Sequence, residues 1–388
     1  MKILFVVNSL VGGGAEKVFM NMLYCLDKDK YSITVLSIDD DGIYREDIKK
    51  IAEYKTIIHH ADNPRLLHYF LGAVSLAWAV VIKWLPASVL HQMFIHDKYD
   101  VEVAYLEGMS TKVVAGSKNK KSFKIAWVHT DVIANPWTRK QFRNVGEENY
   151  CYHKMDQVIA VSDDVKKSVE QKFPVCAQTM YNVLDDKYIL QTAKNGMRRF
   201  QKQKEVSFIS VGSLWHIKGY MRLLKIFRQL IKENYSIELH LIGTGEDEKS
   251  LKAFIRQNKM DGWVTMHGFQ REPYDLMSCA DVYICSSYAE GLSTTVAEAL
   301  ILGLPVITTD CAGMRDLLGD SEYGYITENK GTSLKHGIQK FLDNPDVVAY
   351  YREKAAERGR DLMAENRIPE LDQLFQNAVA RKRKLKRP

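Results

Sequence analysis

The stretch VYICSSYAEGLSTTVAEALILGLPVITT, residues 282–309, contains a strand, a loop and a helix in succession. An apolar run from Val282 to Cys285 predicts the strand, and Ser286-Ser287 predicts a turn after it. The residues directly before the helical pattern are Glu290, Gly291, Leu292, Ser293 and Thr294. A helix start offers free backbone N–H groups and the positive end of the helix dipole, so this loop is suited to bind an anion.

Two carboxylates flank the turn. Glu290 lies on the loop and Glu298 about one turn inside the helix, with seven residues between them. If a ligand's phosphates occupied the backbone amides, the carboxylates could accept hydrogen bonds from sugar hydroxyls on either side, which suits a nucleotide sugar. Acidic residues are also favoured in the first turns of any exposed helix, so the spacing alone leaves both interpretations open.

The same stretch resembles the donor-site signature of the retaining nucleotide-sugar glycosyltransferases of family four. The E-x7-E spacing of Glu290 and Glu298 is followed by Gly303-x-Pro305-Val306. Upstream, Gly268-Phe269 and the pattern Tyr274-x-x-Met277-x-x-Ala280-Asp281 also match that family. The resemblance extends over nearly the whole chain, and its motifs occur in the family's order.

Length and composition indicate a globular protein with room for two domains, because the chain has 388 residues and 46% of them are apolar. The six cysteines lack metal-ligand or redox spacing, which predicts free thiols in a reducing compartment. They are Cys25, Cys151, Cys176, Cys279, Cys285 and Cys311. The apolar run from Ile3 to Val7 is too short for a secretory signal and lacks a cleavage site, so we expect a cytoplasmic protein.

The formal net charge of +6 comes from the C-terminal end of the chain. Six basic residues occupy the last eight positions: Arg381, Lys382, Arg383, Lys384, Lys386 and Arg387. The rest of the chain is therefore near neutrality, which does not fit a nucleic-acid-binding protein with a basic folded face. Such a tail is either a solvated end or a segment attracted to an anionic membrane surface.

A second candidate for membrane contact is LLHYFLGAVSLAWAVVI, residues 66–82, which contains no acidic residue, lysine or arginine. Its length is at the lower limit for a membrane span, and the flanking Trp84, Lys83 and Pro86 favour an interfacial or cleft-lining helix. A buried core helix is the alternative. In membrane-associated members of the family, this part of the N-terminal domain faces the lipid, so we expect peripheral attachment to the inner face of the plasma membrane.

Near the N-terminus, a buried strand at Lys2 to Asn8 is followed by Gly12-Gly13-Gly14 and a helical pattern. Glycines here allow a backbone to approach a phosphate, although a plain tight turn would give the same pattern. A dinucleotide fingerprint lacks its third glycine, because Lys17 stands in that place. The resemblance instead implies that Gly13 and Gly14 belong to the first glycine loop, which faces the interdomain cleft, and makes them candidates for donor binding.

Further strand-like runs in the N-terminal half alternate with helical stretches, as in a parallel doubly wound sheet. Functional side chains on such sheets gather at the carboxyl ends of strands. Glu107 follows one strand, and His129 and Asp131 follow another. By resemblance His129 is a cleft histidine that contacts the donor sugar or stabilises charge near the leaving phosphate, while Glu107 and Asp131 are weaker candidates for acceptor contacts.

The second half opens with a strand and the loop Gly212-Ser213-Leu214-Trp215-His216-Ile217-Lys218-Gly219. The family's corresponding loop carries an arginine and a lysine that clamp the diphosphate. Lys218 matches, whereas Ser213 stands where the arginine is expected. Either the serine hydroxyl donates to a phosphate, or Arg222 compensates from one turn along the helix, or the site is degenerate.

The resemblance implies the GT-B fold, two Rossmann-like α/β domains facing an interdomain cleft. Residues 1–183 would form the acceptor-binding domain and residues 184–364 the nucleotide-sugar domain, while the helix and basic tail at 365–388 cross back to the first domain. The polar stretch 185–204 is expected to be a flexible linker.

The implied reaction transfers a hexosyl or N-acetylhexosaminyl unit from a nucleotide sugar, most often a UDP-sugar, with retention and without a metal or other cofactor. Lys218 and the Ser293 and Thr294 amides would hold the diphosphate, Glu290 the donor sugar and Glu298 the ribose. The acceptor would be a lipid-linked glycan of capsule or O-antigen synthesis. A nucleotide-sugar epimerase of the same fold and a catalytically silent partner in a polysaccharide-assembly complex are the alternatives.

Overall fold

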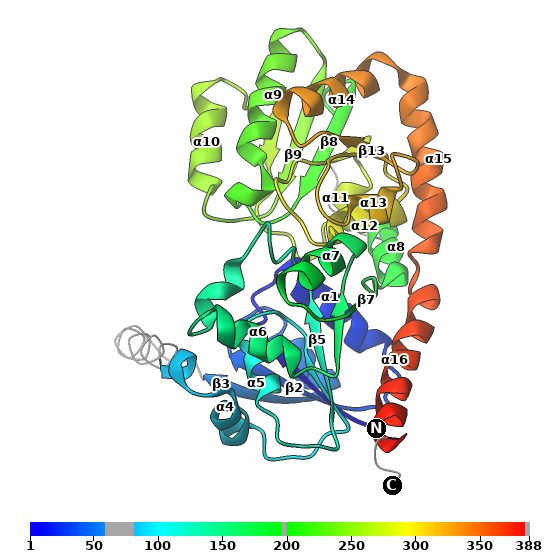
Figure 1. Cartoon of the computed structure of the whole chain (residues 1–388). Coiled ribbons are helices and arrows are strands. Elements are labelled where there is room, and N and C mark those ends of the chain that lie inside the picture. Colours follow the sequence, from blue (N-terminus) through cyan, green and yellow to red (C-terminus); the bar gives the residue numbers. More distant parts are fainter. Residues whose placement is uncertain (59–80, 196–199, 385–388) are drawn as a thin grey trace. The chain divides into compact units, whose positions relative to one another are not determined.

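The structure is a computed structural model and describes residues 1–58, 81–195 and 200–384 (Figure 1). Two compact units make up the chain. One contains Met1–Asn182 and Arg367–Pro388, and the other contains Val183–Asn366.

The first unit is built around a seven-stranded sheet in the order β3-β2-β1-β4-β5-β6-β7. Its elements are β1 (Lys2–Val7), α1 (Gly14–Cys25), β2 (Ser32–Asp39), α2 (Arg45–Ile51), β3 (Glu53–Ile58), α4 (Ala87–Phe94), β4 (Val101–Ala104), α5 (Met109–Ala115), β5 (Phe123–Val128), the 3₁₀ helix η1 (Trp137–Gln141), α6 (Val145–His153), β6 (Gln157–Ala160), α7 (Asp163–Lys172) and β7 (Ala177–Thr179). The helix α16 (Ala364–Lys384) belongs to this unit from Arg367 onward.

The second unit has a six-stranded sheet in the order β10-β9-β8-β11-β12-β13. Its elements are α8 (Asp186–Asn195), β8 (Val206–Val211), the 3₁₀ helix η2 (His216–Lys218), α9 (Tyr220–Lys232), β9 (Ile237–Ile242), α10 (Glu248–Gln257), β10 (Val264–Met266), α11 (Tyr274–Met277), β11 (Val282–Cys285), α12 (Thr294–Ile301), β12 (Val306–Thr309), α13 (Met314–Leu318), β13 (Tyr325–Thr327), α14 (Gly331–Asp343) and α15 (Pro345–Asp361).

Both sheets have the doubly wound topology. Every strand pairing in the described part of the chain is parallel. In each sheet the strand order reverses beside the first strand, so β1 lies between β2 and β4, and β8 lies between β9 and β11. Ligands of such sheets bind at the carboxyl ends of the strands that flank this reversal.

This topology determines where the candidate residues lie. The loop after β8 carries Ser213 and Lys218, and the loop after β11 carries Glu290, so both loops leave the reversal point of the second sheet. The glycine loop after β1 and Glu107 after β4 occupy the equivalent point of the first sheet. Segments that are remote in sequence are therefore brought to one edge of each sheet.

The expected linker over residues 185–204 is wrong for its first half. Residues 186–195 form α8, which packs against α11 and α12 within the second unit. Ile189 and Ala193 stand four residues apart on one face of this helix and are buried. Apart from the buried Asp186, the polar side chains lie on the remaining faces, so the polar composition belongs to the solvent-facing side of an amphipathic helix.

The final helix α16 returns to the first unit, as expected. Phe375 is fully buried, and its ring lies against those of Phe5 and Tyr31, with centroids 6.1 and 5.8 Å away. Asp372 accepts hydrogen bonds from the Tyr31 hydroxyl at 2.8 Å and from Lys30 at 3.1 Å. These contacts attach the last helix of the chain to β1 and to the residues directly before β2.

The segment 66–82, expected to contact a membrane, lies outside the described residues except for Val81 and Ile82. Ile82 is buried in the core of the first unit. Among the helices that the structure describes, none combines the length and apolar character needed to cross a bilayer.

Candidate functional site

The loop from Ser286 to Glu290 is fastened from several directions. Ser286 donates to the carbonyl of Lys218 at 2.9 Å, and the Tyr288 amide donates to the carbonyl of Ile217 at 2.7 Å. The carbonyl of Ser287 accepts a hydrogen bond from the Thr309 hydroxyl at 2.6 Å. The loop after β11 is thereby tied both to the loop after β8 and to the end of β12.

Two glycines allow the loops after β8 and β12 to come close to the loop after β11. Gly219 precedes α9 with φ of 69°, and a Cβ at this position would lie 2.0 Å from the carbonyl oxygen of Ser286. Gly313 precedes α13 with φ of 74°, and a Cβ there would lie 2.3 Å from the carbonyl oxygen of Gly291. Only glycine accommodates both the backbone angle and the close contact.

Lys218 and Glu290 meet in this region. The Lys218 Nζ lies 2.7 and 2.8 Å from the two carboxylate oxygens of Glu290, and the Ser287 hydroxyl donates to one of them at 2.6 Å. Burial favours the neutral amine, but the Glu290 carboxylate outweighs it and raises the pKa of Lys218. The structure thus holds a charged ammonium beside the loop that precedes α12.

Arg222, the residue that could compensate for the serine at position 213, contacts the loop after β11. Its guanidinium donates to the carbonyls of Ser286 and Ser287, and its other terminal nitrogen donates to Asn329 at 2.8 Å. It also lies over the ring of Tyr288, at 4.1 Å from the centroid. In this structure the arginine holds the loop that carries Glu290, a contact that the sequence does not indicate. Compensation by Arg222 for the serine at position 213 stays a hypothesis.

Ser213 itself is exposed, and within the described residues its hydroxyl makes no hydrogen bond. Trp215, two residues later, is also exposed. The loop after β8 consequently presents one fixed cation, Lys218, together with a serine hydroxyl that is free to donate.

The start of α12 has the form expected of an anion-binding terminus. Ser293 is the residue before the helix, and its hydroxyl accepts a hydrogen bond from the Val296 amide at 3.4 Å. The first turn of α12 contains no acidic residue. The stretch Gly291, Leu292, Ser293 and Thr294 therefore leads into a helix start whose partial positive charge is not already neutralised by a local carboxylate.

Glu298 lies in the middle of α12 and is fully buried. The Tyr274 hydroxyl, from α11, donates to its carboxylate at 3.0 Å. Tyr274 is part of the motif noted in the sequence, but its partner could not be known before α11 and α12 were seen together.

In the first unit, Glu107 organises the loop after β5. It is 1% exposed, and one of its carboxylate oxygens accepts hydrogen bonds from the backbone amides of His129 and Thr130 and from the Thr130 hydroxyl. Burial raises the pKa of Glu107, while these hydrogen bonds act in the opposite direction. The carboxylate faces the backbone of its own unit, a geometry that suits positioning of His129 better than direct contact with an acceptor.

His129 is a buried, neutral histidine. Burial lowers its pKa to about 3, against the opposite effect of a backbone hydrogen bond with Tyr105. Its ring packs on that of Tyr105 at 4.7 Å, and within the described residues its Nε2 has no hydrogen-bond partner. With the other ring nitrogen held by a carbonyl, Nε2 is the acceptor of the neutral imidazole.

The remaining candidates of the first unit lie in turns. Gly13 directly precedes α1, which begins at Gly14, and the Glu16 side chain folds back toward Gly13. Burial raises the pKa of Glu16, and the nearby Glu107 adds to this effect. Asp131 accepts hydrogen bonds from the amides of Ile133 and Ala134, both at 2.9 Å, so it stabilises its own turn.

Within the described residues, no group of three or more His, Cys, Asp or Glu side chains is arranged to hold a metal.

Comparison with known proteins agrees with this geometry. Residues 194–361 match the family model described as Glycosyl transferases group 1. An uncharacterized glycosyltransferase of Haemophilus influenzae is 21% identical over 94% of this chain and 97% of its own length. The Campylobacter jejuni N-acetylgalactosamine-N,N'-diacetylbacillosaminyl-diphospho-undecaprenol 4-alpha-N-acetylgalactosaminyltransferase is 23% identical over 91% of this chain and 93% of its own length.

Solved structures extend the likeness to the whole fold. Anabaena HepE in complex with UDP-glucose superposes with a TM-score of 0.75 at 18% identity, covering 97% of this chain and 100% of that one. The sucrose-phosphate synthase of Thermosynechococcus elongatus gives 0.76 at 15% identity, covering 98% and 100%. Over residues 194–361 the chain is therefore similar to the group 1 glycosyltransferases, and as a whole it has the GT-B fold.

Proposed function

We propose that this enzyme transfers a hexosyl or N-acetylhexosaminyl unit, with retention, from a UDP-sugar to a lipid-linked glycan in surface-polysaccharide synthesis. The observation that carries the proposal is the Lys218–Glu290 pair at the carboxyl edge of β8 and β11. It provides one cation for a leaving diphosphate and one carboxylate for sugar hydroxyls at the same point of the sheet. The UDP-glucose bound by HepE and the undecaprenol-linked substrate named for the Campylobacter jejuni relative support the donor and acceptor classes.

The departing diphosphate is stabilised by Lys218 and by the backbone amides at Ser293 and Thr294. An ammonium has three N–H donors, so Lys218 can keep its contact with Glu290 and still donate to a phosphate oxygen. Donors fixed before the reaction stabilise developing charge without reorganisation. The fastening of residues 286–290 by Arg222 and Thr309 supplies that fixed geometry.

The remaining roles follow from protonation and burial. Glu290 orients the donor sugar, Glu298 accepts from the ribose, and Gly13 and Gly14 allow backbone to approach the donor. His129 is neutral, so it accepts a hydrogen bond from a sugar hydroxyl through Nε2 and does not serve as a cation for the phosphate. Glu107 positions His129, and Asp131 stays the weaker candidate for acceptor contact. A phosphate oxygen of the donor takes the acceptor proton.

Peripheral membrane attachment is part of the proposal. Trp84, Val81 and Met93, on and just before α4, are 62%, 43% and 41% exposed, and they lie at or soon after the end of the apolar run 66–82 in the sequence. Exposed tryptophan and aliphatic side chains suit the interfacial region of a bilayer. Flotation with anionic vesicles tests this, because a Trp84→Ala/Met93→Ala variant that floats as well as the parent would contradict it.

The function is tested with Lys218→Ala. We expect transfer from UDP-sugar to fall by at least about 100-fold, since a preorganised charge donor is removed. Lys225→Ala, an exposed lysine on α9, is the matched control and should behave as the parent. Activity of Lys218→Ala within a few-fold of the parent would remove Lys218 from the diphosphate site.

The exposed Ser213 keeps the silent-partner hypothesis as a second candidate. An enzyme without its clamp would neither bind nor turn over a nucleotide sugar. Thermal-shift titration with UDP, GDP, ADP and their hexose conjugates separates the two: a response to one nucleotide supports a donor site, and no response to any of them supports the silent partner.

A further inference from the structure

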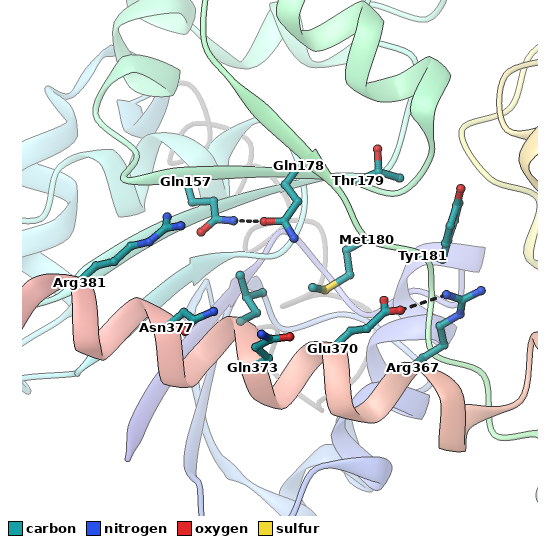
Figure 2. Close-up of a pocket in the computed structure, with 11 residues that line it drawn as sticks. Gln157, Gln178, Thr179, Met180, Tyr181, Arg367, Glu370, Gln373, Asn377 and Arg381 are labelled. Atoms are coloured by element: carbon teal, nitrogen blue, oxygen red, sulfur yellow. Dashed lines mark hydrogen bonds and ion pairs between the residues drawn. The ribbon is translucent and has the colours of Figure 1, made fainter.

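A polar groove lies between α16 and the last two strands of the first sheet (Figure 2). Its volume is about 420 Å³, and all the residues that line it belong to the first unit. Gln157 from β6 and Gln178 from β7 form one side, and α16 forms the other. We call it the α16 groove. None of the residues that line the groove is among the candidate donor-site residues.

The α16 wall is one continuous face of the helix. Arg367, Glu370, Gln373, Asn377 and Arg381 follow one another at steps of three or four residues and point toward the strands in Figure 2. At 1.5 Å per residue, this face extends over about 20 Å. A groove of this length accommodates an extended ligand better than a single small molecule.

Much of the hydrogen-bonding capacity of the groove is unused. The Gln157 amide donates to the Gln178 carbonyl oxygen at 2.5 Å, which leaves one donor group and one acceptor group of this pair available. Within the described residues, the side chains of Gln373, Asn377 and Arg381 make no hydrogen bond. The side-chain amides on both walls therefore offer hydrogen-bond donors and acceptors to a ligand in the groove.

Charge and apolar surface narrow the choice of ligand. Arg367 pairs with Glu370 at 3.4 Å and lies over the Tyr181 ring at 5.0 Å, so among the lining residues only Arg381 carries an unbalanced charge. Met180 and Leu374, the aliphatic lining residues, are each 5% exposed. A polyanion would need more cations, and a lipid chain would need more apolar surface.

We propose that the α16 groove binds an oligosaccharide segment of the glycan substrate, at a distance from its reacting end. A sugar hydroxyl both donates and accepts, as an amide side chain does, so a row of glutamine and asparagine side chains matches a row of hydroxyls. The inference rests on the proposed function for the identity of the ligand as a glycan. A second contact of this kind raises the effective concentration of a long acceptor without any change in the donor site.

The test uses the full-length protein on an array of bacterial oligosaccharides built from hexose and N-acetylhexosamine units, with saturating UDP present. We expect binding of at least one oligosaccharide, weakened about tenfold or more by Asn377→Trp, which fills the groove from an exposed helix position. Gln373→Ala should weaken the same binding, whereas Gln376→Ala, exposed on α16 but outside the groove, should not.

Two results would overturn the proposal: no retained oligosaccharide, or equal binding by the parent and Asn377→Trp. The UDP-induced thermal shift and the slow hydrolysis of UDP-sugar without acceptor are measured on the same samples. They should be the same in Asn377→Trp and the parent. If the parent shows neither the thermal shift nor the hydrolysis, the proposed donor site is refuted. If it shows both but binds no oligosaccharide, only the proposed role of the α16 groove is refuted.

Discussion

At position 213 a serine stands where the resemblance implies an arginine, and the structure leaves room for the larger side chain. Ser213 is exposed and its hydroxyl has no partner among the described residues, while both terminal nitrogens of Arg222 donate to Ser286, Ser287 and Asn329. We therefore predict that Ser213→Arg tightens UDP binding about tenfold, because a guanidinium makes charge-assisted hydrogen bonds to phosphate. Calorimetric titration with UDP measures this.

Ser213→Gln is the matched variant, since it adds length and polarity without charge. It should leave the UDP affinity within a few-fold of the parent. If Ser213→Arg binds UDP no better than Ser213→Gln, position 213 does not face the diphosphate.

His129 makes a separate prediction about pH. Its pKa is about 3 in the folded state and about 6.5 in the unfolded state, so folding favours the neutral ring. The stabilisation is complete above pH 6.5 and is lost as the pH falls from 6.5 toward 3. Between pH 7 and pH 4 this single group should reduce the free energy of unfolding by about 3 kcal/mol.

The measurement is the difference in unfolding free energy between the parent and His129→Gln as a function of pH. The difference should shrink on acidification, because the glutamine variant lacks the titration. His153→Gln, at an exposed position, serves as the control and should parallel the parent. A parent–variant difference that is constant from pH 7 to pH 4 would show that His129 is not buried in its neutral form.

At the scale of elements, the loop 286–290 depends on the glycine that precedes α9. A Cβ on Gly219 would lie 2.0 Å from the Ser286 carbonyl oxygen, and its φ of 69° is unfavourable for alanine. We predict that Gly219→Ala destabilises the protein by about 2 kcal/mol or more, a decrease in melting temperature of about 5 °C. Transfer activity should fall as well, because the displaced carbonyl belongs to the loop that carries Glu290.

Gly262→Ala is the control, since a Cβ at Gly262 meets nothing within 4 Å. Differential scanning fluorimetry of the two variants compares the same chemical change in two environments. Equal melting temperatures would mean that the loops after β8 and β11 do not approach as closely as described.

Elements defined by local pattern could be predicted from the sequence, and contacts between remote elements could not. The apolar run Val282–Cys285 became β11 with the same bounds, because a continuous apolar run before a turn specifies a buried parallel strand. The linker expected at 185–204 is wrong for residues 186–195, because the buried Ile189 and Ala193 are spaced as on one face of a helix. The role of Arg222 depends on α9 meeting the 286–288 backbone, and no local pattern encodes that meeting.

At the scale of the whole molecule, family motifs predicted two doubly wound sheets and the return of the final helix to the first unit. The α16 groove was not predicted, because Gln178 and Asn377 are 199 positions apart and only the return of α16 brings their walls together. Each unit has its own core, with separate sets of buried apolar side chains. The effect of a substitution in one core on stability can therefore be measured in the unit that contains that core.

Phe375 tests how much of the first unit depends on the chain's last helix. Its ring is fully buried against Phe5 and Tyr31, so Phe375→Ala removes a core aromatic and should cost about 3–5 kcal/mol. Hydrogen exchange should quicken in β1, in α16 and at the start of β2, because Phe5, Phe375 and Tyr31, the residue before β2, line the cavity. Protection of β8 and β11 and the UDP response should persist, since Phe375 contributes nothing to the second core.

The control is Phe341→Ala, which removes a buried phenylalanine of the second unit and should give the opposite pattern. If Phe375→Ala left exchange in β1 and β2 unchanged, α16 would be a peripheral appendage of the first unit, and the groove beside it would lose its second wall.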